Sequence, residues 1–190
     1  MEPTLYTIKA ILILDNEGKR IISKVCYNYS FIFYLTFQYF DNQAFPSNKS
    51  RLGFETRLFS KTSKIPTAEI ILFEGYTCVY RNNVDLFFYV IGDVYENELL
   101  LANALQCLYD SIHQILKHNV EKKQLLECLD LILLALDELC DGGILMESDS
   151  TSLTSRVGVK QEETPLGEQT MGQVIKSARE QLKLSNLLRG

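Results

Sequence analysis

The stretch from Thr77 to Leu116 constrains the fold most strongly. It opens with two apolar runs, Cys78–Tyr80 and Val84–Ile91, which are separated by Arg81-Asn82-Asn83. Because Asn tolerates the positive φ of tight turns, the two runs are predicted to form a β-hairpin that turns at these three residues. The second run is apolar almost throughout, which is typical of a central strand covered on both faces.

A long amphipathic helix is predicted directly after this strand. Gly92 ends the strand, and Asp93 and Glu96 have the spacing of an N-cap residue and a carboxylate that bonds back to it. Apolar residues then recur every three or four positions and form one stripe on a helix of about six turns. The stripe consists of Leu101, Leu105, Leu108, Ile112 and Ile115. The strand therefore runs into a helix that must lie back across the sheet.

The first part of the chain supplies three further strands and a helix. Leu5–Asp15 and Lys19–Lys24 are predicted to pair as an antiparallel hairpin, since the turn between them contains Gly18. A helix is expected through Arg51–Phe59, capped by Ser47 or Asn48. Ala68–Phe73 reads as a short strand that Glu74-Gly75 turns into the hairpin described above.

The last part of the chain is predicted to be helical. The helix Glu121–Cys140 has leucines on nearly every side, so we expect it to be buried on several faces. Asp141-Gly142-Gly143 stops this helix, and an extended connector follows. Ser148-Asp149-Ser150 can cap a short helix that ends near Val157. Glu168–Leu188 has apolar residues at helical spacing and is predicted to form a final amphipathic helix.

Length, net charge and the distribution of apolar residues exclude several classes of protein. At 190 residues the chain is long enough for one domain with a sizeable core. Its net charge of -5 argues against bulk nucleic-acid binding. The first residues have an acid before the apolar run and no small-residue cleavage site, so no secretory signal is expected. No run reaches the roughly 18–20 apolar residues of a membrane span.

The residues that could carry chemistry have structural interpretations, and we assign no catalytic, cofactor-binding or metal-binding residue. The odd number of cysteines and the lack of C-x-x-C spacing predict small core hydrophobes in a reducing compartment. The cysteines lie at positions 26, 78, 107, 128 and 140. His113 and His118 are five positions apart on a helix, so they are expected to face different sides, at the surface or its boundary. The pair Glu96 and Glu98 is assigned to capping and to compensation of the helix dipole.

Two surface features leave alternatives open. Arg51, Arg57, Lys61 and Lys64 could form a basic patch near the first helix, and a solvated face is favoured over contact with a membrane surface or nucleic acid. The Leu-rich helices offer more apolar surface than one sheet face can cover. Since monomers rarely expose large apolar patches, this surplus indicates a subunit of a larger assembly.

Several segments of the sequence resemble the zeta subunits of coatomer, a vesicle coat of the Golgi. Together these segments span nearly the whole chain apart from Val25–Gln38. They read LYTIKAILILDNEGKRIISK, VDLFFYVIG followed by YENELLL, NVEKKQLLE, DELCDGGILMESD and QVIKSAREQLKLSNLLR. The sigma chains of clathrin adaptors are more distantly similar, and the predicted C-terminal helix over Gln169–Arg189 favours zeta.

This resemblance implies an α+β, longin-like fold: a five-stranded antiparallel sheet flanked by helices, with additional C-terminal helices. Residues 1–147 would form the longin-like core, with 25–38 as an insertion or retained-intron segment. Residues 148–190 would form a helical extension. No complete cargo-binding motif of the sigma chains can be matched residue by residue.

The resemblance also implies a non-catalytic structural role in a hetero-oligomer. Zeta subunits pair with the trunk of the coatomer gamma subunit, in a core that an Arf-family GTPase recruits from the cytoplasm to the Golgi membrane for retrograde transport. No cofactor and no nucleic acid are implied. The alternatives are a longin-type regulatory module for a SNARE or a small GTPase, which the lack of a heptad tail disfavours, and an enzyme of unrecognised type.

The segment Val25–Gln38 yields the first prediction. It is uncharged, rich in aromatic residues and alternates with period 2, and removing it would join Lys24 to Tyr39 as in zeta-like chains. Val codons begin with GT and Gln can be encoded by CAG, which match the two ends of an intron, so we expect an in-frame retained intron or a gene-model error. The alternative is a lineage insertion that forms an extra hairpin.

Transcript sequencing tests this expectation. Abundant message that contains the segment without GT and AG ends would contradict it. Deleting Val25–Gln38 is expected to raise the soluble yield obtained together with a gamma subunit, because an uncharged, β-prone edge promotes aggregation. An unchanged or lower yield would place the segment in the fold.

Overall fold

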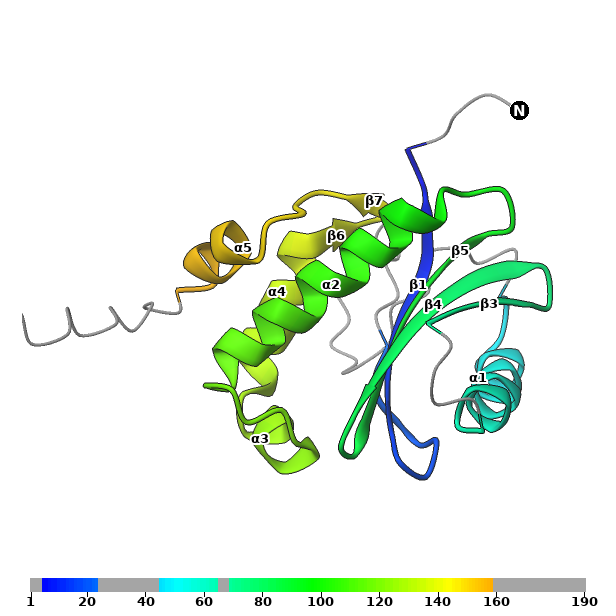
Figure 1. The fold of residues 1–190 in the computed structure, drawn as a ribbon, viewed down its shortest axis with the longest axis horizontal. Helices are drawn as coiled ribbons and strands as arrows, with labels where there is room; N and C mark the ends of the chain where they lie inside the picture. Colours follow the sequence, from blue (N-terminus) through cyan, green and yellow to red (C-terminus); the bar gives the residue numbers. More distant parts are fainter. Residues whose placement is uncertain (1–4, 24–44, 65–68, 159–190) are drawn as a thin grey trace, which may run out of the picture. The chain divides into compact units, whose positions relative to one another are not determined.

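The computed structural model describes residues 5–23, 45–64 and 69–158. Within these ranges the chain forms a five-stranded antiparallel sheet that lies between two helical layers (Figure 1). The predicted fold class is confirmed. The segment Val25–Gln38 and the predicted helix Glu168–Leu188 lie outside the described residues. The predicted division into 1–147 and 148–190 stays a prediction, because most of the second part also lies outside them.

The strands follow the order β2-β1-β5-β4-β3 across the sheet. They are β1 (Ile8–Asp15), β2 (Arg20–Ser23), β3 (Ile70–Phe73), β4 (Tyr76–Asn83) and β5 (Leu86–Asp93). A separate two-stranded hairpin pairs β6 (Cys140–Asp141) with β7 (Ile144–Leu145).

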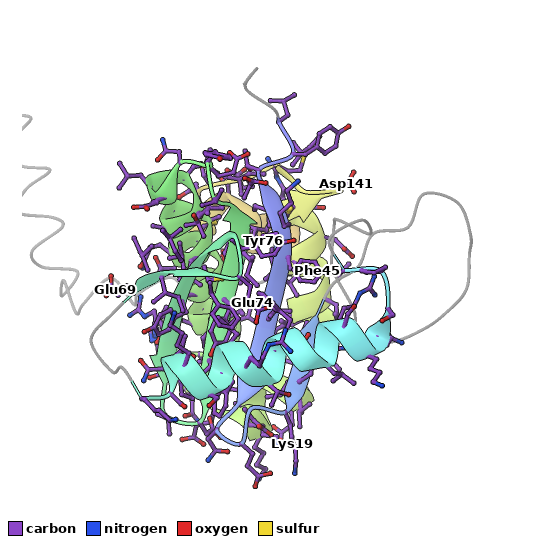
Figure 2. The ribbon with its side chains drawn as sticks, turned by 90° about the vertical axis from the view of Figure 1, so that its right-hand side faces the viewer. Lys19, Phe45, Glu69, Glu74, Tyr76 and Asp141 are labelled. Carbon is purple, nitrogen blue, oxygen red and sulfur yellow. The ribbon has the colours of Figure 1, made fainter. Side chains whose placement is uncertain are left out.

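Helices cover both faces of the sheet. They are α1 (Asn48–Thr62), α2 (Glu98–Ile115), α3 (Lys122–Glu127), α4 (Leu129–Leu139) and α5 (Ser150–Arg156). Figure 2 shows α1 lying across the strands on one face, with α2 and α4 behind the sheet. None of the helices in the described ranges is long and apolar enough to cross a membrane.

Alternation along the central strands divides the core into two parts. Phe88 and Val90 of β5 pack toward α2, whereas Tyr89 and Ile91 pack toward α1, and all four are fully buried. Strand β1 alternates in the same way, and the register shift between Ile8 and Ala10 turns Ile8 to the α2 side. The predicted two-sided burial of Val84–Ile91 is thus confirmed from Leu86 onward, apart from half-buried Phe87.

The α2 layer depends on close approach at Gly92. A Cβ placed on Gly92 would lie 2.7 Å from Leu101 Cδ1 and 3.0 Å from the Thr7 carbonyl oxygen. Only a residue without a side chain therefore lets α2 pack this tightly on the end of β5. The predicted stripe of α2 is buried throughout its length.

Aromatic residues and one buried ion pair hold the α1 layer. Phe45, Phe54 and Tyr76 form a cluster with ring centroids 5.0–5.9 Å apart. The guanidinium of Arg20 donates two hydrogen bonds to the Glu55 carboxylate, at 2.6 and 2.8 Å, and both side chains are buried. This pair fixes α1 against the edge strand β2.

The N-cap of α1 confirms one of the two predicted candidates. The Ser47 hydroxyl accepts the Ser50 backbone N–H at 3.1 Å, and Ser50 Oγ in turn accepts the Ser47 backbone N–H at 3.2 Å. The helix therefore begins with a reciprocal capping box, here formed by two serines.

The predicted turn at Arg81-Asn82-Asn83 is wrong. These residues continue β4, and the turn is formed by Val84 and Asp85, with Val84 at φ +47°. The Asp85 carboxylate accepts the Lys122 backbone N–H at 3.1 Å, and the Asn83 amide donates to the Val120 carbonyl oxygen at 3.2 Å. The hairpin end is thus held by the segment that leads into α3, which offsets an unfavourable backbone conformation for a β-branched residue.

The predicted N-cap of α2 at Asp93 is also wrong. Asp93 still pairs with Tyr76 in the sheet, so its backbone is committed to the strand. The residues after it make a turn, and Asn97 caps the helix by accepting the Leu99 backbone N–H at 2.9 Å. Glu98 lies in the first turn as expected, but Glu96 lies before the helix.

The predicted single helix Glu121–Cys140 is divided at Cys128 into α3 and α4. The two parts are anchored at different places, α3 by Lys122 at the end of the sheet and α4 by its buried side chains in the core. The predicted connector after Asp141-Gly142-Gly143 is the hairpin β6–β7, which both glycines permit at positive φ. Asp149 caps α5 as one of the three predicted residues.

The Asp15 carboxylate joins three segments at one end of the sheet. It accepts the backbone N–H groups of Glu17 and Lys19 at 3.0 and 2.8 Å and the Lys122 ammonium at 2.7 Å. Burial alone raises the pKa of Asp15, but the hydrogen bonds from Lys122 and the two N–H groups outweigh it, so the pKa lies below its ordinary value.

The substitution Asp15→Asn is expected to lower the free energy of unfolding at pH 7 by about 1 kcal/mol. The amide oxygen can still accept the backbone N–H groups of the turn, but the ion pair with the half-exposed Lys122 is lost. Because the folded pKa is depressed, the wild-type contribution is present above the unfolded pKa and is lost as the pH falls through the folded pKa. Urea titrations at pH 7 and pH 3 measure both effects. Asp130→Asn, at an exposed position, is the control, and a variant with the wild-type pH dependence would contradict the role of Asp15.

Candidate protein interface

The described residues contain no group of three or more His, Cys, Asp or Glu side chains that could hold a metal ion. The cysteines in these ranges form no disulfide, and Cys78, Cys107 and Cys140 are buried while Cys128 is half-buried. Burial raises the pKa of Cys78 to about 12 and that of Cys107 to about 11. Both thiols therefore stay protonated at neutral pH, as expected of core residues. Cys26 lies outside the described residues.

The two histidines do not face different sides, as the helical spacing had predicted. Helix α2 ends at Ile115, and Lys117 and His118 follow at φ +49° and +70°, which turns the chain back on the helix. The Nδ1 atoms of His113 and His118 lie 3.1 Å apart. The expected position is nevertheless confirmed, with His113 half-buried and His118 exposed.

Three of the four basic residues near α1 lie together, because Arg57, Lys61 and Lys64 line one open hollow of about 590 Å³. Arg51 is buried and its Nε donates to the Phe45 carbonyl oxygen at 2.9 Å. Arg57 makes a bidentate pair with Glu74, at 2.6 and 2.9 Å, on the turn between β3 and β4. Lys61 lies over the Phe73 ring, 5.4 Å from its centroid. With one cation buried and another neutralised, the arrangement agrees with a solvated face.

An open groove of about 540 Å³ lies between α1 and the β1–β2 turn. Its two carboxylates are already engaged, because Glu17 pairs with Lys19 and Glu55 pairs with Arg20. Among the described residues that line the groove, no acid and base are therefore placed together for catalysis.

Apolar side chains reach the surface on several elements. The large hydrophobic residues that are exposed are Leu5, Tyr6, Leu52, Ile70, Leu72, Val84, Val94, Tyr95, Leu99, Leu126, Leu134 and Met146. Two of them, Ile70 and Leu72, lie on the same side of the edge strand β3. Edge strands and apolar helix surfaces of this kind are contact sites in assemblies.

The α3–α4 segment departs most from its predicted burial. The core takes up Leu125 from α3 and four residues of α4: Ile132, Ala135, Leu136 and Leu139. Leu126 and Leu134 are 50% and 51% exposed, whereas Leu131 and Leu133 are half-buried. The prediction that this region is buried on several faces is therefore confirmed in part, since Leu129, Leu131 and Leu133 also pack against the core, whereas Leu126 of α3 and Leu134 of α4 stay exposed.

The comparisons with known proteins agree with a subunit of a coat. The family model for the clathrin adaptor complex small chain matches residues 7–164. A chain of the structure described as "Homology model of the full-length AP-3 complex in a stretched open conformation" has the same fold, with a TM-score of 0.50 and 18% identity over 80% of this chain and 92% of that one. These matches define the class as the small chains of adaptor-type coats.

Sequence identity narrows this class. The chain is 47% identical to coatomer subunit zeta-1 of Homo sapiens over 187 residues, covering 98% of this chain and 97% of the relative. It is 45% identical to coatomer subunit zeta-2 of Homo sapiens (98% and 81% covered) and 41% identical to coatomer subunit zeta-1 of Oryza sativa subsp. japonica (96% and 97% covered). The chain belongs to the coatomer zeta family, a family of structural coat subunits, which confirms the resemblance inferred from the sequence.

The buried thiols are expected to resist alkylation. At pH 8 the thiolate fraction of Cys78 would be roughly one in 10⁴, and its side chain is inaccessible, so native Cys78 and Cys107 should react with iodoacetamide at least about 100-fold more slowly than in denatured protein. Mass spectrometry of tryptic peptides measures the labelling. Half-buried Cys128 is the internal control, and rapid labelling of native Cys107 would show that it is a reactive thiol.

Proposed function

We propose that this chain is the non-catalytic structural subunit of a coatomer coat that pairs with the trunk of the gamma subunit. The observation that carries the proposal is the 47% identity to a coatomer zeta subunit across 98% of the chain. The pairing would work by burial of apolar surface and shape complementarity, with no bond made or broken. Turnover of a substrate that one polar substitution abolishes would contradict the non-catalytic role.

The exposed apolar residues support this role. Ile70 and Leu72 are exposed on the edge strand β3, and Leu126 and Leu134 are exposed on α3 and α4, which is unfavourable in an isolated chain. A large subunit that covers them removes this apolar area from water. The gain is roughly 25 cal/mol for each Å² of apolar area buried.

The location and transport step follow from the same pairing. The assembled core would be cytoplasmic and would be recruited to the cytosolic face of the Golgi membrane by an Arf-family GTPase, which this chain contacts only through the complex. It would serve Golgi-to-ER and intra-Golgi vesicle transport. The relatives are coat subunits, so a longin-type regulator of a SNARE or a small GTPase has no support from them.

The chain expressed alone is expected to be poorly soluble, and co-expression with the gamma trunk is expected to raise its soluble yield several-fold. The reason is that the trunk covers the exposed apolar faces. Size-exclusion chromatography should then give one equimolar peak, with the trunk expressed alone as the control. A chain that stays a well-behaved monomer and elutes apart from the trunk would contradict the proposal.

A further inference from the structure

The outer surface of α1 carries a cluster of cations and hydroxyl groups. The cluster lines one open hollow of about 590 Å³. Its residues, which are all exposed, are Thr56, Arg57, Ser60, Lys61 and Lys64. We refer to these five residues as the basic hollow.

Most of the positive charge of the basic hollow is not neutralised by the described residues. Glu74 accepts both hydrogen bonds from the Arg57 guanidinium, at 2.6 and 2.9 Å, and so offsets one of the three cations. Lys61 and Lys64 form no ion pair with a carboxylate in the described ranges, and this includes Glu69, which directly precedes β3. The hollow therefore keeps two ammonium groups beside a guanidinium that is already held in place.

The charge of α1 is opposite to that of the helices on the other side of the sheet. The segment from Asn48 to Lys64 has five basic residues and one acidic residue, Glu55, which is buried against Arg20. The sequence from position 98 to position 156, which forms α2 to α5, has ten acidic and four basic residues. Since α1 covers one face of the sheet and α2 with α4 covers the other, an anionic surface would orient the chain with α1 toward it (Figure 1).

We propose that the basic hollow binds the phosphate groups of anionic lipids, so that α1 faces the membrane on which the coat assembles. The choice of a lipid surface rests on the function proposed above. Lys61 and Lys64 would supply positive charge, and the Ser60 hydroxyl would donate a hydrogen bond to a phosphate oxygen. The Arg57 guanidinium would be shared between Glu74 and a phosphate, which its several donors permit.

The strength of such a contact suits a coat. A few cations bind an anionic leaflet weakly, so one chain by itself would dissociate readily and the hollow would be solvated. Many copies held in one coat would bind together much more strongly than any single copy. The contact would therefore orient a subunit that the rest of the coat keeps at the membrane.

The basic hollow suits other anionic partners less well. An acidic peptide is recognised through pockets for its side chains as well as through charge, whereas the residues that line this open hollow are three cations and two residues with hydroxyl groups. A nucleic acid needs many phosphate contacts, and the net charge of -5 opposes the approach of a long polyanion. A flat lipid surface needs only charge and hydrogen bonds, and it leaves the acidic helices on its far side.

The first experiment measures flotation with vesicles of phosphatidylcholine that contain about 30% phosphatidylserine, at about 50 mM salt. The full chain is used alone and in complex with the gamma trunk. The double substitution Lys61→Gln and Lys64→Gln is expected to lower the partition coefficient about 30-fold, which corresponds to about 1 kcal/mol for each lysine near an anionic leaflet. The matched control is Lys117→Gln with Lys123→Gln, which removes the same charge at exposed positions after α2 and on α3 and should leave the partition coefficient nearly unchanged.

A second set of variants tests the charge of the hollow in the opposite direction. Glu74→Gln frees the Arg57 guanidinium, so we expect the partition coefficient to rise about 5-fold. The double substitution Lys61→Arg and Lys64→Arg keeps the charge and should bind like the wild type. Salt at about 500 mM should abolish binding, and vesicles of phosphatidylcholine alone should not bind the chain. Melting curves establish that each variant is folded.

The outcomes separate this inference from the proposed function, because pairing with the trunk is measured separately by size-exclusion chromatography. If the chain does not pair with the trunk, the proposed function fails, and flotation of the chain alone still decides whether the hollow binds lipid. If the wild type does not float, or if the Lys61 and Lys64 variant and the control variant lose binding equally, the lipid site is overturned. A lysine-dependent affinity for a polyglutamate peptide without affinity for vesicles would also overturn it. If the effect of the substitutions disappears in the complex, the trunk covers α1 and the proposed orientation is wrong.

Discussion

Two-sided burial of β5 is the constraint on which the rest of the structure depends. Its side chains alternate between the two halves of the core, so neither face can be left in water. The sheet is stable only if α1 covers one face and α2 with α4 covers the other. The hydroxyl group of Tyr89, the one phenol in this strand, forms a hydrogen bond with the Thr62 hydroxyl at 2.8 Å. Burial raises the pKa of Tyr89, so the phenol stays protonated. An apolar strand thus imposes a three-layer architecture.

Two ion pairs fix the orientation of the helices on the sheet, which apolar packing alone does not specify. Arg20 and Glu55 join an edge strand to α1, and Asp15 and Lys122 join the central strand β1 to α3. A buried pair adds little net stability, because the loss of hydration offsets the attraction, but a broken pair leaves an uncompensated charge. Orientations of α1 that would separate the Glu55 carboxylate from the Arg20 guanidinium are therefore disfavoured, which explains how a helix that packs on an apolar sheet is held in one orientation.

Sequence patterns predicted the elements that neighbouring residues determine. The wrong predictions concern features that depend on contacts between residues far apart in the sequence. Apolar runs bounded by turn residues sufficed to predict the strands, and the stripe from Leu101 to Ile115 sufficed to predict α2, since burial follows directly from such patterns. The turn at Val84-Asp85 could not be predicted in this way, because Val120 and Lys122, nearly forty residues away, hold it. The contact between the histidines depends on how α2 ends, which the helical spacing does not contain. For the candidate interface, the leucines indicated a partner, but only the structure separates core positions from surface positions.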